Sequence, residues 1–578
     1  MKKTITAHFG QKHSANATFS TFLLTFAIKT KHNVLFAMKS FFSICLMIAC
    51  AYAGINTAWA QRFSRDFSHK YDRHTPSDVC RIRSNYAGHL KEKITEKDMR
   101  QARIVIIAGD INGDDIAVLR KLCSRVSCSD ANGRSVENYV DLDLSGARIR
   151  SGGAYYSTYR CTRDEIGENM FSQCSALRSI VLPEWTTYIH KRAFASCSRL
   201  EDVMMPRGVR GIDNEAFRNC KYLSIIDLPE GIERIGNEAF YGCDHLAKVN
   251  LPQSLKSIGS EAFRNCPFTA IRLPHQLQSI GSNAFSYTKL TEIEIPATAR
   301  LEGSLGYIPS LSQINVAPGS EAYTSENGIL YSHQDTTLHT FPMGKGGAVN
   351  VPQGVRSIGS YAFYHSKVSS VILPESIEEI GKGAFSNCSA LTSCHLPESL
   401  GMLKDATFDG CTRLLQVNLP HTLTDIGIKA FHNCESLREI SLPEGLKSIG
   451  NEAFRNCKSL NNVAVPAGVT TLAYKVFNEC HALTHITLAE GLTVIEESAL
   501  DNCNLSELVI PSTVSSIGKK MVEKNRNLQK IEVRATRPPE LKSDSEKKVP
   551  LYVPEASIEL YRNAKNWKNY KTILPIKP

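Results

Sequence analysis

Apolar positions recur with a period of 23 residues along most of this 578-residue chain. Each repeat reads Leu-x-x-Ile-x-Leu-Pro, then Ile-Gly-x-x-Ala-Phe, with a Cys three residues after the Phe. Successive residues of a strand point to opposite faces. The first segment therefore predicts a short strand with Ile and Leu pointing inward and one residue between them pointing outward. The second segment predicts another inward-facing apolar group on the return leg. The chain is predicted to be a stacked array of such turns.

Two further columns follow the same period. We interpret the phenylalanine column as a buried aromatic spine. We interpret the cysteine column as a ladder of small buried thiols, which we expect to be free because parallel side chains are poorly directed for disulfides. The phenylalanines are Phe171, Phe194, Phe217, Phe240, Phe263, Phe285, Phe363, Phe385, Phe408, Phe431, Phe454 and Phe477. The cysteines are Cys174, Cys197, Cys220, Cys243, Cys266, Cys388, Cys411, Cys434, Cys457, Cys480 and Cys503, with Thr288 and Ser366 taking the place of Cys in two turns.

These patterns predict an α/β-type solenoid, a leucine-rich repeat array with a parallel sheet on the concave face, capped at both ends. The repeats are expected over 161–533. An irregular insertion interrupts them at about 297–350, where apolar segments 328–331 and 337–341 flank five polar residues. This pattern predicts a hairpin with a five-residue loop. Insertions in solenoids can contribute to binding, but a repeat that simply drifted would give the same pattern.

The segments on either side of the repeats are predicted to be caps. In the N-terminal cap, 84–160, we expect a strand at 102–109, a helix at 116–123 capped by Asp114 or Asp115, and a first irregular repeat strand at 140–145. In the C-terminal cap, 534–578, we expect a strand at 551–554 followed by a helix at 557–567.

The first 60 residues are predicted to be an N-terminal extension and a signal peptide. Lys39 precedes an apolar run, and Ala58-Trp59-Ala60 has the small-x-small pattern of a cleavage site. We expect Met38 to be the true start; a lipid anchor at Cys50 is the alternative. Residues 61–83 are polar and read as a flexible leader. No apolar run long enough to span a membrane follows the signal, so a secreted or outer cell-surface location is expected.

Composition and motifs argue against several classes of function. The formal net charge is +10, and six of these charges are lysines within the first 60 residues, leaving +4 for the rest. This balance gives no support for nucleic-acid binding. There is no Cys-x-x-Cys pair, metalloprotease motif, nucleophile elbow or phosphate-binding glycine loop. We therefore predict no metal, no cofactor and no enzymatic activity. A disulfide between two of Cys80, Cys123, Cys128 and Cys161 is left open.

The candidate ligand-binding residues lie at outward strand positions. The inward residues repeat, whereas the outward ones change in chemistry from turn to turn, as a recognition surface requires. Outward positions that are under no structural or functional constraint would vary in the same way. The polar and charged stretch 227–294 is our first choice. The candidates are Asp227, Asn250, Arg272, Glu292, Glu294, His395 and Asn418.

The repeat Leu-x-x-Ile-x-Leu-Pro-x-x-Leu-x-x-Ile-Gly-x-x-Ala-Phe-x-x-Cys resembles the BspA-like leucine-rich repeat family over about 165–533. The segments 111–115, 142–145 and 551–554, with Tyr561 and Trp567, resemble the leaders and endings of that family. These are surface or secreted proteins of Bacteroidetes and some mucosal protozoa. The resemblance implies adhesion to host matrix proteins, epithelial cells or other bacteria, and it carries over no functional residue. The asparagine ladder of the commoner leucine-rich repeats is absent.

Three hypotheses for function follow. The first is an exported binding module or adhesin, a monomer whose ligand is a protein or glycan of the host matrix or epithelial surface. The alternative is a structural component of the cell surface without a host ligand. The third, a glycan-processing enzyme, needs a carboxylate pair, for which Glu292 and Glu294 are the candidates.

Overall fold

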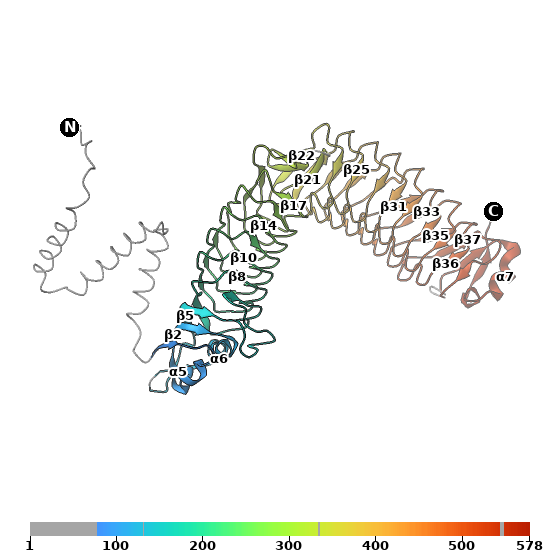
Figure 1. Ribbon diagram of the computed structural model, residues 1–578. Helices are drawn as coiled ribbons and strands as arrows, with labels where there is room; N and C mark the ends of the chain where they lie inside the picture. The colour runs from blue at the N-terminus through green and yellow to red at the C-terminus, as the bar shows by residue number, and fades with distance from the viewer. Residues whose placement is uncertain (1–77, 131, 333–335, 544–547, 578) are drawn as a thin grey trace, which may run out of the picture. The chain divides into compact units, whose positions relative to one another are not determined.

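The computed structural model describes residues 78–130, 132–332, 336–543 and 548–577. The chain divides into two units, residues 1–79 and 80–578, and the second contains the repeat array (Figure 1). The predicted signal segment, Cys50 and most of the leader lie outside the described residues. Strand β1 (Val79–Ser84) begins inside the predicted leader. The predicted leader boundary was therefore too late, because arginines between the apolar residues of β1 conceal its strand pattern. Among the described helices, none is long and apolar enough to cross a membrane.

The Leu-x-x-Ile-x-Leu segments form a first ladder of parallel strands. Neighbouring turns pair in register, so that Ile226 lies beside Val249 and Asp227 beside Asn250. The first sheet has the order β1-β2-β5-β7-β9-β11-β13, and shorter sheets continue the ladder. The later strands of the first sheet are β2 (Ile104–Ile111), β5 (Val140–Ile149), β7 (Leu177–Val181), β9 (Asp202–Met204), β11 (Ile225–Asp227) and β13 (Lys248–Asn250). The strands that follow are β16 (Glu292–Ile295), β18 (Gln313–Val316), β22 (Gly346–Asn350), β24 (Lys367–Ile372), β26 (Ser393–His395), β28 (Gln416–Asn418), β31 (Asn462–Val465), β33 (His485–Leu488), β35 (Glu507–Ile510) and β37 (Lys530–Val533).

A second ladder runs through the return legs, where the Ile before the Gly pairs with its equivalent in the next turn. Its strands have two residues each. They are β6 (Glu165–Ile166), β8 (Tyr188–Ile189), β10 (Gly211–Ile212), β12 (Arg234–Ile235), β14 (Ser257–Ile258), β15 (Ser279–Ile280), β17 (Arg300–Leu301), β23 (Ser357–Ile358), β25 (Glu379–Ile380), β27 (Met402–Leu403), β29 (Asp425–Ile426), β30 (Ser448–Ile449), β32 (Thr471–Leu472), β34 (Val494–Ile495), β36 (Ser516–Ile517) and β38 (Glu540–Leu541). The predicted parallel-sheet solenoid is confirmed. Between 161 and 533, the described residues contain no helix.

The phenylalanine and cysteine columns hold adjacent turns together. Consecutive phenylalanine rings stack, with centroids 5.1 Å apart for Phe194 and Phe217, and both rings are fully buried. The Phe194 carbonyl accepts the backbone N–H of Cys197, 3.1 Å away, and also the thiol of Cys220 in the next turn, at 3.1 Å. A carbonyl has two lone pairs, and both are used here. The same thiol-to-carbonyl bond recurs along the column, for example from Cys457 to Phe431 at 3.2 Å.

The described cysteines are all free and buried. The prediction of free thiols in the column is therefore confirmed, and Thr288 and Ser366 are buried in the same column. Cys123 joins it as well, since its thiol hydrogen-bonds Cys174. The disulfide left open among Cys80, Cys123, Cys128 and Cys161 is not formed. Burial raises the pKa of nine thiols of the column, Cys457 among them, and raises that of Cys80 to about 11.

Each turn also contains two residues in the left-handed backbone conformation, on either side of the buried phenylalanine. Around Phe454 these are Glu452 (φ 57°) and Asn456 (φ 62°). This conformation costs an ordinary residue roughly 1–2 kcal/mol, and asparagine and glycine tolerate it best. The position before the cysteine is accordingly often Asn or Gly. These tight turns were not predicted from the sequence.

The N-terminal segment continues the first sheet and shares its core. It contains α4 (Leu90–Lys93), α5 (Glu96–Gln101), α6 (Gly113–Cys123) and the short antiparallel pair β3 (Cys128–Ser129) and β4 (Ser135–Val136). The prediction that Asp114 or Asp115 caps the helix was wrong. Asn112 is the N-cap and α6 begins at Gly113, because the Asn112 side chain accepts the Asp114 N–H at 3.0 Å.

Asp115 has a larger role than capping. Its carboxylate is fully buried and accepts three backbone N–H groups: Gly88 at 2.6 Å, Leu90 at 2.8 Å and Asn112 at 3.0 Å. It therefore ties the segment before α4 to the start of α6.

The C-terminal segment contains the predicted strand, and a helix that is shorter than the predicted 557–567. It contains β39 (Leu551–Val553), the 3₁₀ turns Glu555–Ser557 and Trp567–Asn569, α7 (Ile558–Asn563) and a further strand, β40 (Ile573–Pro575). Tyr561 and Trp567 are buried, and both polar groups are satisfied. The Tyr561 hydroxyl donates to the Ala535 carbonyl at 2.8 Å, and the Trp567 indole N–H donates to the Pro539 carbonyl at 2.7 Å.

The insertion contains the predicted hairpin and a second hairpin directly before it. β20 (Ile329–Ser332) pairs antiparallel with β21 (Thr337–Thr340), and residues 333–335 of the loop are outside the described part. β20 also pairs antiparallel with β19 (Tyr323–Glu326) across a two-residue turn, Asn327-Gly328, with φ 51° and 74°. Asn-Gly is a strong hairpin signal that the sequence analysis missed. β21 then pairs with β23, which returns the chain to the second ladder.

β20 divides the hydrophobic core in two. Leu330 belongs to the cluster that extends back to Cys80, whereas Ile329 and Tyr331 belong to the cluster that extends forward to Ile573. Since successive residues of a strand face opposite ways, one strand closes both blocks. The insertion is thus part of the core.

Replacing Asp115 by alanine should destabilise the N-terminal segment by at least about 3 kcal/mol, because three backbone donors lose a charged acceptor. Asp114→Ala is the matched control, since Asp114 is exposed at the same helix end, and it should cost less than about 1 kcal/mol. Hydrogen exchange over 84–123 measures the difference. Equal exchange rates in the two variants would contradict this role.

Stability should fall as the pH rises above about 8.5, the ordinary pKa of a thiol. Cys457 and eight other thiols of the column have raised pKa values, so they stay protonated while the unfolded chain releases its protons. The stability that each contributes is present below the unfolded pKa and is lost above it. Cys457→Ala should reduce the slope by at most about 1.4 kcal/mol per pH unit, measured by denaturant unfolding at several pH values. Val463→Ala, a buried change without a thiol, should leave the slope as it is.

Candidate functional site: an exposed strand face

The side chains of all the candidate residues are exposed to solvent. The pairing of strands between neighbouring turns places several of them side by side. Asp227 on β11 lies directly beside Asn250 on β13. His395 on β26 lies beside Asn418 on β28. Glu292 and Glu294 are both on β16 and point to the same side, facing Gln313 and Asn315 of β18.

The candidates do not form one uninterrupted sheet. β13 ends the first sheet, and Arg272 lies in the next turn, in a segment without a strand. β16 pairs separately with β18, which lies within the insertion, and β26 and β28 belong to the sheet that follows, β22-β24-β26-β28. The structure therefore gives three local groups, with Arg272 between the first two.

A second outward column was missed. In many strands the residue before the inward Ile or Val is also exposed, as Ile225 and Lys248 show beside the inward Ile226 and Val249. Ile225 has 47% of its surface exposed. The alternation of strand side chains predicts this column, since it lies two residues before the one we chose. The strand face is therefore two residues wide in each turn, and it mixes apolar, basic and acidic groups.

The two glutamates do not resemble a glycosidase pair in their surroundings. The acid of such a pair is ordinarily held in an apolar pocket that keeps it protonated at neutral pH. Glu292 and Glu294 are both exposed on one strand. Among the described residues, no group of three or more His, Cys, Asp or Glu side chains is placed to hold a metal ion.

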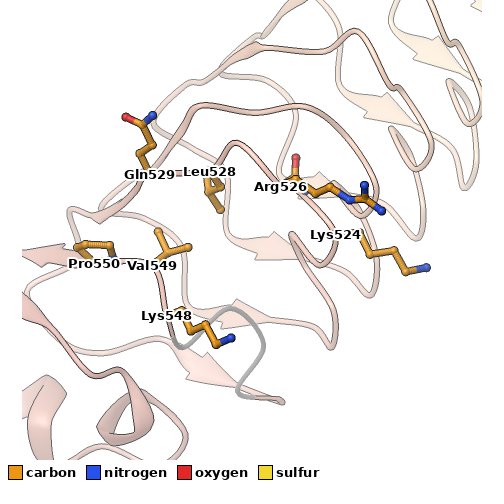
Figure 2. Close-up of a pocket in the computed structure, with 8 residues that line it drawn as sticks. Lys524, Arg526, Leu528, Gln529, Lys548, Val549 and Pro550 are labelled. Carbon is orange, nitrogen blue, oxygen red and sulfur yellow. The ribbon is translucent and has the colours of Figure 1, made fainter.

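A groove of about 350 Å³ lies near the C-terminal end of the array, beside β37 (Figure 2). Three of its lining residues are basic: Lys524, Arg526 and Lys548. Figure 2 shows that these side chains extend outward without converging on a common point. The amide of Asn525 is used within the fold, since it donates to the carbonyls of Leu500 and Val522. The groove therefore has a basic rim but no organised set of ligand-binding groups.

The fold defines a leucine-rich repeat solenoid whose exposed groups vary along a constant frame. The chain belongs to the BspA type leucine rich repeat family, whose model matches residues 158–224, 211–319, 343–461 and 401–529, more than half of the chain. No match was found among curated proteins.

Several solved structures are similar to this chain. A leucine rich cell surface protein from Faecalibacterium prausnitzii is 27% identical, covering 63% of this chain and 92% of that one, with a TM-score of 0.48. A leucine-rich repeat protein from Bacteroides ovatus is 22% identical, covering 77% and 94%, with a TM-score of 0.41. The pneumococcal vaccine antigen PcpA is 20% identical, covering 70% and 80%, with a TM-score of 0.36.

The strand face should be free of structural constraint. Asn250→Ala should change the free energy of unfolding by less than about 0.5 kcal/mol, as surface changes usually do. Val249→Ala, one residue away and pointing into the core, should cost about 2 kcal/mol. Denaturant unfolding measures both. A large loss of stability in Asn250→Ala would show that the outward column supports the fold.

Proposed function

We propose that this protein is an exported or cell-surface binding module, an adhesin that uses the strand face to hold a ligand of the host matrix or epithelial surface. The observation that carries the proposal is the contrast within each turn. The inward Phe and Cys columns are nearly constant and buried, whereas the two outward columns are exposed and change their chemistry from turn to turn. A rigid frame of this kind can present many different side chains without changing its fold.

Export is part of the same proposal and rests on the sequence pattern at 38–60. Family membership supports a binding role, since solenoids provide extended surfaces for partners. The exposed setting of Glu292 and Glu294 favours binding over glycan hydrolysis, because it lacks the enclosed environment that such catalysis uses. We expect the protein to act as a monomer.

The test is binding of the full chain to immobilised matrix proteins, mucins and glycans. The strand-face variant has alanine at Asp227, Asn250, Arg272 and Glu294. The control has alanine at Gln276, Lys289, Glu302 and Glu321, which are also exposed and give the same change in net charge. We expect saturable binding by the parent and the control, and at least about a tenfold loss in the strand-face variant, as when interface hot spots are truncated.

The outcomes separate the hypotheses. Equal binding by both variants would show that the strand face is not the binding site. Absence of binding to every immobilised ligand, together with self-association in sedimentation, would favour the structural alternative.

A further inference from the structure

A cluster of aromatic side chains lies on the turns on both sides of the insertion. We call Tyr287, Tyr307, Tyr361, Tyr364 and His365 the tyrosine cluster. Ring centroids are 5.0 Å apart for Tyr287 and Tyr307, 4.9 Å for Tyr307 and His365, 4.4 Å for His365 and Tyr364, and 5.8 Å for Tyr364 and Tyr361. The rings therefore form one continuous series.

The insertion creates this series. Tyr287 and Tyr307 belong to consecutive turns, since the Tyr287 N–H donates to the Tyr307 carbonyl at 2.6 Å. The chain then leaves to form β18 to β21 and returns, and His365 in the returning turn contacts Tyr307. In Figure 1 this region lies where green passes into yellow, near β17 and β21.

The backbone at the cluster is unusual for aromatic residues. Tyr287, Tyr361 and His365 have φ of 60°, 57° and 55°, a conformation that costs such residues roughly 1–2 kcal/mol each. At the place of Tyr287 and His365, neighbouring turns have Asn265 and Asn387, which tolerate it better. The repeat imposes this conformation on every turn, so an aromatic ring in place of asparagine is retained where the side chain has a use. The structure gives these rings no such use in the core, because Tyr287 and Tyr361 are 51% and 45% exposed.

The cluster presents an uncharged surface. Partial burial lowers the pKa of His365 and raises that of Tyr364, so both are neutral near neutral pH. A cation against it, Arg264, lies over the Tyr287 ring at 5.1 Å and is hydrogen-bonded to Glu261 at 3.1 Å. The surface therefore consists of aromatic faces with hydroxyl groups and an imidazole at their edges.

The partner that fits this chemistry is a carbohydrate. A pyranose ring has apolar C–H faces, which pack on the electron-rich face of an aromatic ring, and a rim of hydroxyls, which tyrosine hydroxyls and an imidazole can bond. Consecutive turns are about 4.8 Å apart, a spacing similar to the length of one sugar unit in an extended chain. A protein anchor would instead favour a deep apolar pocket.

We propose that the tyrosine cluster binds an extended, uncharged glycan chain that packs against the exposed parts of the Tyr287 and Tyr361 rings. This site deepens the proposed binding function and rests on it, because both take the protein to be a binding module. It lies on the turns beside the phenylalanine column and not on the strand face, so the two sites can be tested separately.

The experiment measures binding of neutral glucose, mannose and N-acetylglucosamine oligomers, from dimer to hexamer, to the full chain by calorimetry. We expect affinity to rise with oligomer length. The double variant Tyr287→Asn, Tyr361→Asn should lose at least about tenfold in affinity, since each ring contributes a stacking contact. It should fold normally, because Asn265 and Asn283 occupy the equivalent places of other turns at similar φ. Tyr287→Phe with Tyr361→Phe keeps the rings and should retain most of the affinity.

Tyr222→Asn is the matched control. Tyr222 is 52% exposed and lies against His245, away from the cluster, so its loss should leave glycan binding unchanged. The strand-face variant should also bind the oligomers as the parent does. Glycan binding that survives in the Asn double variant, or that is lost only in the strand-face variant, would overturn the tyrosine cluster as its site.

The remaining outcomes distinguish the two proposals. If no oligomer binds but a matrix protein binds through the strand face, the cluster proposal fails and the proposed function stands. If a matrix protein binds and the Asn double variant loses it, the cluster is a protein-binding site and the glycan proposal is overturned. If neither class binds, both proposals fail.

Discussion

The structure depends on the contacts that the phenylalanine and cysteine columns make between successive turns. One turn of 23 residues cannot bury its apolar side alone. Within each run of regular turns, consecutive phenylalanines stack; the Phe217 carbonyl, for example, accepts both the N–H of Cys220 and the thiol of Cys243 in the next turn. A thiol is a weak donor, but it is small enough to pack in a column and leaves no buried carbonyl lone pair unused.

This arrangement separates the frame from the surface. The inward residues and the phenylalanine and cysteine columns contact the turns before and after. A substitution at these positions therefore disturbs the packing of neighbouring turns. The outward side chains of the strands point to solvent and are not packed against the core of neighbouring turns. Asp227 and Asn250 can therefore differ from His395 and Asn418 while the strands beneath them pair in the same register. The variable strand face is a consequence of the repeat's internal bonding.

The insertion modifies the array in two ways at once. It closes two hydrophobic blocks through the opposite faces of β20, and it brings Tyr307 against His365 on the outside. A segment that departs from the repeat thus remains part of the core and also assembles an aromatic surface that no regular turn could form. The proposed strand face and tyrosine cluster occupy different parts of the turn, which allows one array to hold two kinds of contact.

The sequence by itself determined the repeat architecture, the buried phenylalanine and cysteine columns, the β20–β21 hairpin and the strand and helix of the C-terminal segment. It could do so because the 23-residue period places the same apolar residues at the same inward positions in every turn. It also placed the candidate residues outward, since strand alternation is local. Only the tertiary structure decided which outward residues are neighbours, because register and the missing strand at Arg272 depend on pairing between turns. It alone showed that Asp115 accepts the N–H groups of Gly88 and Leu90, more than twenty positions away, and that the insertion unites aromatic residues more than fifty positions apart. Those contacts are made between segments whose separation along the chain carries no periodic pattern.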